Sequence, residues 1–114
     1  MTKSVDIFVA SDQELAEFAA DLSELFTIEL VPIDEGNAYQ FRNGAIALTV
    51  KPHTYPDLAD YRYHLAVTGD TYGIEMQRVK WREDWAIDFY QALKATGRYR
   101  LRRMSNAHER YELL

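Results

Sequence analysis

Hydrophobic and polar residues alternate with two different periods along this chain of 114 residues. Residues 5–10 form a short run rich in β-branched and aromatic side chains, which predicts a strand. After this run, apolar residues recur every three or four positions up to Thr27, which predicts an amphipathic helix with one buried stripe. Ser11 and Glu14 have the spacing of a capping box, so we expect the helix to begin there.

Four further runs alternate with the period of two that is typical of strands. They span residues 27–33, 38–42, 45–51 and 61–68. The second and third runs meet at Asn43-Gly44, a dipeptide well suited to the positive φ angles of a type I′ turn, which predicts a tight hairpin. Two prolines within residues 52–57 exclude regular structure there.

The last third of the chain holds a second helix and a closing strand. Residues 74–80 fit either a strand or an early helical turn. From about Lys80 an apolar stripe at helical spacing predicts a helix, and Gly97 stands where a left-handed cap would end it. Residues 98–104 alternate as a strand, and residues 105–114 add a short helical turn or fray.

The predicted order is β-α-β-β-β-β-α-β in a single domain that spans residues 1–114. Because each helix has one apolar stripe, both must share one face of a mainly antiparallel sheet, in a two-layer α+β sandwich. We expect the other face of the sheet to be polar and open to water. The positions expected on the helix-covered face are Ile28, Leu30, Tyr39, Phe41, Ile46, Leu48, Val50, Tyr63, Leu65, Val67, Tyr99 and Leu101. Those expected on the open face are Glu29, Gln40, Arg42, Thr49, Lys51, Arg62, His64, Thr68, Arg98, Arg100 and Arg102.

Composition narrows the classes of function. The chain has 18 acidic residues against 13 lysines and arginines, a net charge of −5 that disfavours nucleic acid and anionic membranes as partners. The absence of cysteine excludes disulfides, thiolate metal sites and cysteine nucleophiles, and it suits a reducing compartment. Without a signal-peptide core or an apolar run near the ~20 residues of a membrane span, we expect a cytoplasmic protein.

Acidic residues gather on the solvent-facing stripe of the first predicted helix and in the turn beyond it. Between Lys3 and Arg42 the sequence has no lysine or arginine that would neutralise them. The stripe is either a solvated helix face or a docking surface that steers a basic protein partner by long-range attraction. The candidate partner-binding residues, with one loop tyrosine included, are Glu14, Glu17, Asp21, Glu24, Asp34, Glu35 and Tyr55.

Arginines alternate with apolar residues along the closing strand. This alternation places Tyr99 toward the core and the arginines on the open face, where they either pair with Glu29 or Asp6 or bind an anion or a partner. Nucleic acid is disfavoured by the net charge. The candidate anion-binding residues are Arg62, His64, Arg98, Arg100 and Arg102.

The chemistry-bearing residues form no catalytic or cofactor motif. His53, His64 and His108 lack the spacing of metal ligands, and the glycines and serines match no phosphate-binding or nucleophile signature. We therefore expect no metal, no cofactor and no catalysis. His64 is either the least unsuited acid–base candidate or an exposed strand residue whose charge is disfavoured by cationic neighbours.

Two segments carry a resemblance: residues 5–10, which lead into the acidic helix, and residues 93–101, which close the sheet. With these segments, the small, acidic, cysteine-free α+β chain resembles the immunity proteins that bacteria encode beside polymorphic toxins. The resemblance implies a non-catalytic protein that binds and neutralises a cognate toxin domain. Two alternatives stay open: a small anion- or metabolite-binding domain that uses the open sheet face, and a structural homodimer that pairs two such faces.

Overall fold

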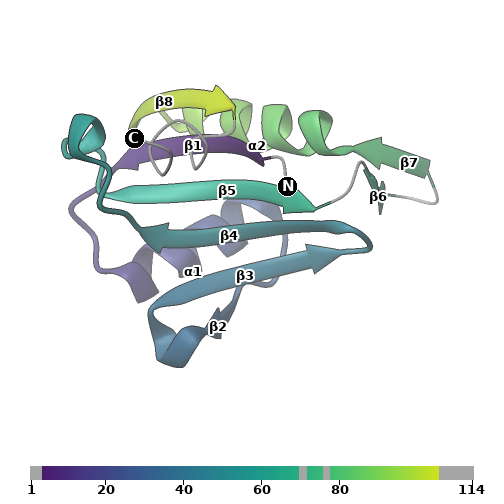
Figure 1. Ribbon diagram of the computed structural model, residues 1–114, viewed down its shortest axis with the longest axis horizontal. Helices are drawn as coiled ribbons and strands as arrows, with labels where there is room; N and C mark the ends of the chain where they lie inside the picture. Colours follow the sequence, from purple (N-terminus) through teal and green to yellow (C-terminus); the bar gives the residue numbers. More distant parts are fainter. Residues whose placement is uncertain (1–3, 70–71, 76–77, 106–114) are drawn as a thin grey trace.

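The computed structural model describes residues 4–69, 72–75 and 78–105. Helices and strands alternate much as the sequence predicts, with two additional 3₁₀ turns (η1, η2) and one additional hairpin (Figure 1). The elements are β1 (Ser4–Ala10), α1 (Leu15–Phe26), β2 (Val31–Ile33), η1 (Asp34–Gly36), β3 (Ala38–Asn43), β4 (Ile46–Pro52), η2 (Pro56–Leu58), β5 (Tyr63–Gly69), β6 (Tyr72–Glu75), β7 (Arg78–Trp81), α2 (Arg82–Thr96) and β8 (Arg100–Ser105).

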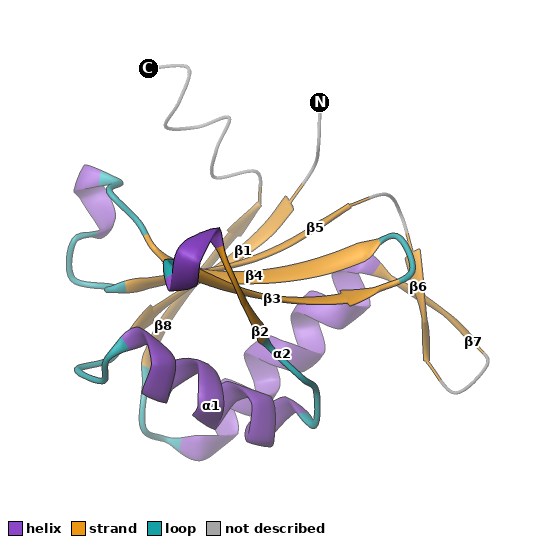
Figure 2. Ribbon diagram, turned by 90° about the horizontal axis from the view of Figure 1, so that it is seen from below, coloured by secondary structure: helices purple, strands orange, loops and turns teal. Residues whose placement is uncertain are grey.

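Six strands form one antiparallel sheet in the order β2-β3-β4-β5-β1-β8. Both helices lie on the same side of this sheet (Figure 2). The predicted α+β fold, a sheet layer packed on a helix layer, is therefore confirmed. No helix in the described part of the chain has the length and apolarity needed to cross a membrane.

The main core lies between the sheet and the helices. All twelve positions predicted to face the helices belong to this core, either fully buried or packed against it. From α1, Phe18 packs on the ring of Tyr63 at a centroid distance of 4.6 Å, and from α2, Phe89 packs on Phe26 at the same distance. Alternation along the strands is the physical reason for this agreement, because every second side chain points to the same face.

The first helix begins later than the sequence predicts. Its first residue is Leu15, and Glu14 occupies the N-cap position without a side-chain hydrogen bond to the helix. Ser11 instead accepts a hydrogen bond from the Gln13 backbone N–H at 3.2 Å, which closes a local turn before the helix. The predicted capping box is therefore wrong.

The strand predicted over residues 27–33 is also shorter than expected, because β2 spans only Val31–Ile33. Thr27 has a left-handed φ of 56° at the C-cap of α1. The backbone N–H of Ile28 donates back to the carbonyl of Ser23 at 3.0 Å. The helix cap therefore uses the residues that the alternation assigned to the beginning of the strand.

The predicted β3–β4 hairpin is present, but its turn lies one residue further along the chain. Asn43 pairs with Ile46, so the two central turn residues are Gly44 and Ala45. Only Gly44 has a positive φ, 59°, which fits a type II′ turn rather than the predicted type I′. The Asn43 side chain instead binds the Ile74 backbone, accepting from its N–H at 3.0 Å and donating to its carbonyl at 2.6 Å.

The segment that fitted either a strand or a helical turn forms a separate hairpin. Among the described residues, strands β6 and β7 pair with each other and not with the main sheet, so they make a second, two-stranded sheet. The following helix begins at Arg82 with Trp81 as its N-cap, and it ends at Gly97, which has the predicted left-handed conformation with a φ of 67°.

The other face of the main sheet is only partly open. A second, smaller core of Phe8 and Leu58 lies on this face, with Tyr55, Tyr61 and Met104 packed against it. The loop that carries η2 supplies most of these side chains and crosses this face near β1 and β5. The expectation of a wholly open polar face is wrong there, whereas Arg42 on β3 remains exposed as predicted.

Candidate functional site

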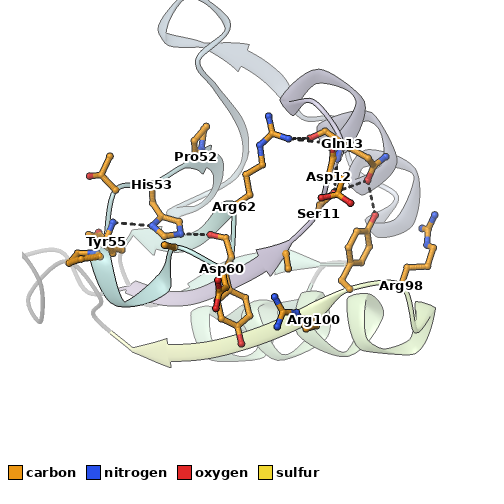
Figure 3. Close-up of a pocket in the computed structure, with 16 residues that line it drawn as sticks. Ser11, Asp12, Gln13, Pro52, His53, Tyr55, Asp60, Arg62, Arg98 and Arg100 are labelled. Carbon is orange, nitrogen blue, oxygen red and sulfur yellow. Dashed lines mark hydrogen bonds between the residues drawn. The ribbon is translucent and has the colours of Figure 1, made fainter.

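An open pocket of about 990 Å³ lies at one end of the main sheet, where β1 ends and β5 and β8 begin (Figure 3). Three chain segments meet there: the connection from β1 to α1, the loop between β4 and β5, and the start of β8. The lining residues are 10–13, 52–56, 59–62 and 98–100. Because these three segments are separated by at least 36 positions in the chain, the pocket has no local sequence signature.

His53 holds the loop that forms one wall of the pocket. Its Nε2 lies within hydrogen-bond distance of the Tyr61 carbonyl, and its Nδ1 accepts from the Tyr55 backbone N–H at 3.1 Å. These partners require the neutral ring, with the proton on Nε2. Burial lowers the pKa of His53, and the nearby His64 lowers it further, although the bond to Tyr61 opposes both effects. The neutral side chain of His53 therefore stabilises this loop through its two hydrogen bonds to the backbone.

Arg62 ties the opposite wall together. Its Nη1 donates to the carbonyl oxygens of Asp12 and Gln13 at 3.3 and 3.0 Å, and its Nη2 lies 3.5 Å from a carboxylate oxygen of Glu14. The acidic stripe is thus neutralised at its first residue by a cation that directly precedes β5. The sequence placed Arg62 and Glu14 too far apart for this contact to be predicted.

Gln13 links the pocket wall to α1, and sequence reasoning missed it. Its side-chain amide donates to Asp21 at 2.5 Å, and its side-chain oxygen accepts from the Tyr99 hydroxyl at 3.2 Å. Its backbone carbonyl accepts from the Tyr63 hydroxyl. Burial raises the pKa of both Tyr63 and Tyr99, so that the two phenols stay protonated donors.

Two further arginines line the pocket. The guanidinium carbon of Arg100 lies 5.7 Å from the ring centroid of Tyr61, and that of Arg98 lies 5.4 Å from the ring centroid of Tyr99. Both distances suit cation–π contact. Within the described residues neither arginine makes an ion pair, so their hydrogen-bond donors remain available to an anion.

His64 and Arg102 do not line this pocket, although the sequence grouped them with the other three candidates. His64 is buried, with its Nε2 2.6 Å from a carboxylate oxygen of Asp6 and its ring stacked on Phe8 at 4.6 Å. The prediction of an exposed histidine among cations is therefore wrong. The reason is that the loop bearing Tyr55 folds over this part of the sheet, with its ring 5.8 Å from that of His64.

The other candidate residues, those for a protein partner, divide between two places. Most of them lie on α1 and η1, and we call this group the acidic surface: Glu14, Glu17, Asp21, Glu24, Asp34 and Glu35. All of them are exposed except Asp21, which is half-buried. Tyr55 instead packs against Phe8 at a centroid distance of 5.9 Å, on the sheet face opposite the helices. The structure therefore separates Tyr55 from the residues grouped with it.

Metal chemistry gains no support from the arrangement of side chains. Within the residues that the structure describes, no three His, Asp or Glu side chains lie close enough together to hold a metal ion. His108 lies outside the described residues.

No protein-family model matches this chain, and the comparisons with curated proteins and solved structures also give no significant match.

Proposed function

We propose that this chain is a non-catalytic, cytoplasmic protein-binding domain that receives a basic partner on its acidic surface. One observation carries the proposal: in the described part of the chain only Glu14 of this surface contacts a cation. Like charges one helical turn apart destabilise a helix by a few tenths of a kcal/mol per pair. A basic partner removes this repulsion and is drawn in by long-range attraction.

The strand beside the acidic surface adds an apolar contact point. Val31 on β2 is 45% exposed, and it lies at the edge of the main sheet, directly before the acidic η1. Protein interfaces commonly combine a small apolar centre with a polar rim. The resemblance to bacterial immunity proteins narrows the partner to one class, a cognate toxin domain whose contact face is basic, and a toxin gene beside this one would support that class.

Paired charge reversals test the acidic surface. Affinity capture from the native cell identifies candidate partners, and each is then purified and titrated against variants of the chain by isothermal calorimetry. Glu17→Lys combined with Glu24→Lys should weaken binding at least about tenfold, because both carboxylates are exposed. The matched control, Asp57→Lys with Asp84→Lys, changes the net charge equally at exposed sites outside this surface and should leave the affinity within about threefold.

Equal losses for the two double variants would overturn the assigned surface, because net charge alone would then explain the effect. Unchanged binding of the Glu17→Lys, Glu24→Lys variant would overturn it as well. Circular dichroism and thermal unfolding of both variants show whether either substitution pair disturbs the fold.

A second candidate function is the binding of a small anion in the pocket. The observation that favours it is the presence of Arg62, Arg98 and Arg100 in one pocket, two of them without a carboxylate partner in the described residues. Thermal shift with about 10 mM citrate or inorganic phosphate tests it. Stabilisation should disappear in Arg100→Gln and persist in Arg102→Gln, an arginine of the same strand that does not line the pocket. An equal response of the two variants would exclude the pocket as the site.

A further inference from the structure

Strand β8 is an edge strand of the main sheet, and we call its unpaired side the β8 edge. The strand pairs with β1 from Arg100 to Ser105, and within the described residues no strand pairs with its other side. Figure 1 shows β8 along the upper margin of the sheet. A sheet edge presents backbone N–H and C=O groups that can pair with another extended chain. The β8 edge is therefore a place where a further strand can be added.

The opposite edge of the sheet is less suited to a further strand. It consists of β2, which has only three residues, with Pro32 at its centre. Proline has no backbone N–H to donate, so pairing along β2 is interrupted. Strand β8 has six residues and no proline. Of the two edges, β8 thus offers the longer continuous backbone for pairing.

Arginines give the β8 edge a positive charge. Residues 98–105 contain four arginines and no acidic residue. All four arginines are exposed, and within the described part of the chain none of them forms an ion pair. They are Arg98, Arg100, Arg102 and Arg103. The charge complementary to this edge is negative.

Neighbouring carboxylates compensate only part of this charge. Asp12 and Asp60 are exposed and line the pocket at the beginning of β8. Asp6 lies on the adjacent strand β1, where it is buried. Arg102 and Arg103 lie further along β8 and do not line the pocket. Four arginines therefore exceed the two exposed carboxylates beside them.

Two of these arginines lie on the same face of the sheet. Arg100 is opposite Ala10 and Arg102 is opposite Phe8 in the register with β1, which places both on the face away from the helices. Alternate residues of a strand are about 6.6 Å apart. An added strand has the same spacing, so acidic residues at every second position meet both arginines. Opposite charges on neighbouring strands stabilise their pairing.

A second copy of this chain is a poor occupant of the β8 edge. Pairing β8 with β8 sets arginines beside arginines, and like charges across neighbouring strands are destabilising. Charged edge strands prevent aggregation between identical sheets in this way. An acidic strand meets attraction instead of repulsion, so charge distinguishes the two occupants.

We propose that the β8 edge binds an extended acidic segment of a partner protein. The segment adds to the main sheet as a further strand beside β8, with alternate carboxylates facing Arg100 and Arg102. Backbone hydrogen bonds supply part of the affinity, and the charge pairs select acidic sequences. The β8 edge shares no residue with the acidic surface, so this inference does not rest on the proposed function.

Titration of the purified full chain with an acidic peptide tests the proposal. The probe is the hexapeptide Glu-Val-Glu-Val-Glu-Val, blocked at both ends, which matches the six residues of β8. Isothermal calorimetry in about 50 mM NaCl, where exposed charges are weakly screened, should show saturable binding with a dissociation constant below about 1 mM. Arg102→Gln should weaken binding at least about fivefold, and because Arg102 does not line the pocket, a small-anion site there does not explain this loss.

Two matched controls separate the edge from charge in general. Arg42→Gln makes the same change of charge at an exposed arginine of β3, which β4, β5 and β1 separate from β8, and it should keep the affinity within about twofold. The peptide Glu-Pro-Glu-Pro-Glu-Pro has the same charges but lacks three backbone N–H donors, and it should bind at least about fivefold more weakly. Thermal unfolding of both variants shows whether either substitution disturbs the fold.

Four results would overturn the proposal. The first is a wild type that does not bind the valine peptide, and the second is an equal loss of affinity in Arg102→Gln and Arg42→Gln. The third is equal binding of the valine and proline peptides, which would mean that charge alone attracts them. The fourth is a hexathymidylate that binds more tightly than the valine peptide and loses this binding in Arg102→Gln, which would assign β8 to nucleic acid. None of these measurements involves the acidic surface or its partner, so they leave the proposed function untouched.

Discussion

The two faces of the main sheet are both buried at β1 and β5, but they are buried in different ways. Toward the helices, alternate side chains such as Ile7, Leu65 and Val67 are fully buried in an apolar layer. On the other face the same strands contribute Asp6 and His64, which are just as inaccessible to water. One face is a helix-packed apolar core, whereas the other contains a polar pair under a loop.

The polar pair, Asp6 and His64, is enclosed by side chains of β1 and of the loop that carries Tyr55. Asp6 accepts a 2.8 Å hydrogen bond from Ser4 and lies 2.6 Å from Nε2 of His64, whose other face is stacked on Phe8. Within the residues that the structure describes, Nδ1 of His64 has no hydrogen-bond partner. The difference between the two faces teaches that a strand pattern reports which side chains point together, and that tertiary contacts decide whether water reaches them.

Truncation in the helix-packed core should produce the largest effect. Phe18 has no exposed surface and contacts the rings of Tyr63 and Tyr99, so Phe18→Ala removes buried apolar area and leaves a cavity. We expect a loss of about 4 kcal/mol in the free energy of unfolding, measured by urea denaturation. Val31→Ala at an exposed site should cost less than about 0.5 kcal/mol. A loss below about 2 kcal/mol for Phe18→Ala would show that this layer is not the dominant core.

Disrupting the polar pair of Asp6 and His64 on the other face should have the next largest effect on stability. His64→Phe preserves the stack on Phe8 but removes the imidazole that the buried Asp6 carboxylate contacts, and it should cost roughly 3 kcal/mol near pH 7. In an Asp6→Asn background the same substitution should cost roughly 1 kcal/mol, which a double-mutant cycle measures. Strictly additive losses would mean that Asp6 and His64 do not stabilise each other. The polar face would then not differ from the apolar face by a stabilising pair.

These two regions also differ in how far the sequence predicts them. The helix-packed positions follow from a period of two in each strand, which is local information. All twelve predicted positions belong to this core, although Ile7 and Val9 of β1 were not among them. The burial of His64 depends on a loop residue such as Tyr55 that folds back across the sheet, and no local pattern contains that return. Alternation alone therefore assigned His64 to an open face.

Local sequence patterns also predict only part of the pocket. The sequence predicted Arg98 and Arg100 on one strand face because they alternate, and both line the pocket. The role of His53 depends on two backbone partners, and that of Gln13 depends on the side chains of Tyr63, Tyr99 and Asp21. Only the folded chain brings these groups within reach. The turn at Asn43 was misplaced by one residue because the Asn43 side chain binds the backbone of Ile74 on β6.

The smallest expected effect concerns the loop that covers the polar pair, through the protonation of His53. Its pKa is lowered in the folded protein, chiefly by burial, so as the pH falls the unfolded chain takes up this proton first, near its ordinary value of about 6.5. The stabilisation is complete above that pH and is lost as the pH falls through the lower, folded value. Protonating Nδ1 also removes the acceptor of the Tyr55 N–H.

His53→Asn tests this effect, because the amide keeps one donor and one acceptor and does not titrate in this range. Urea unfolding at about pH 7.5 and about pH 5.5 should show that the wild type loses more stability between the two conditions than this variant does. Phe18→Ala, which changes only the helix-packed core, should retain the wild-type dependence on pH. If the stability of His53→Asn depends on pH as that of the wild type does, the pH dependence comes from groups other than His53. The loop over the polar face would then be no more sensitive to pH than the helix-packed face.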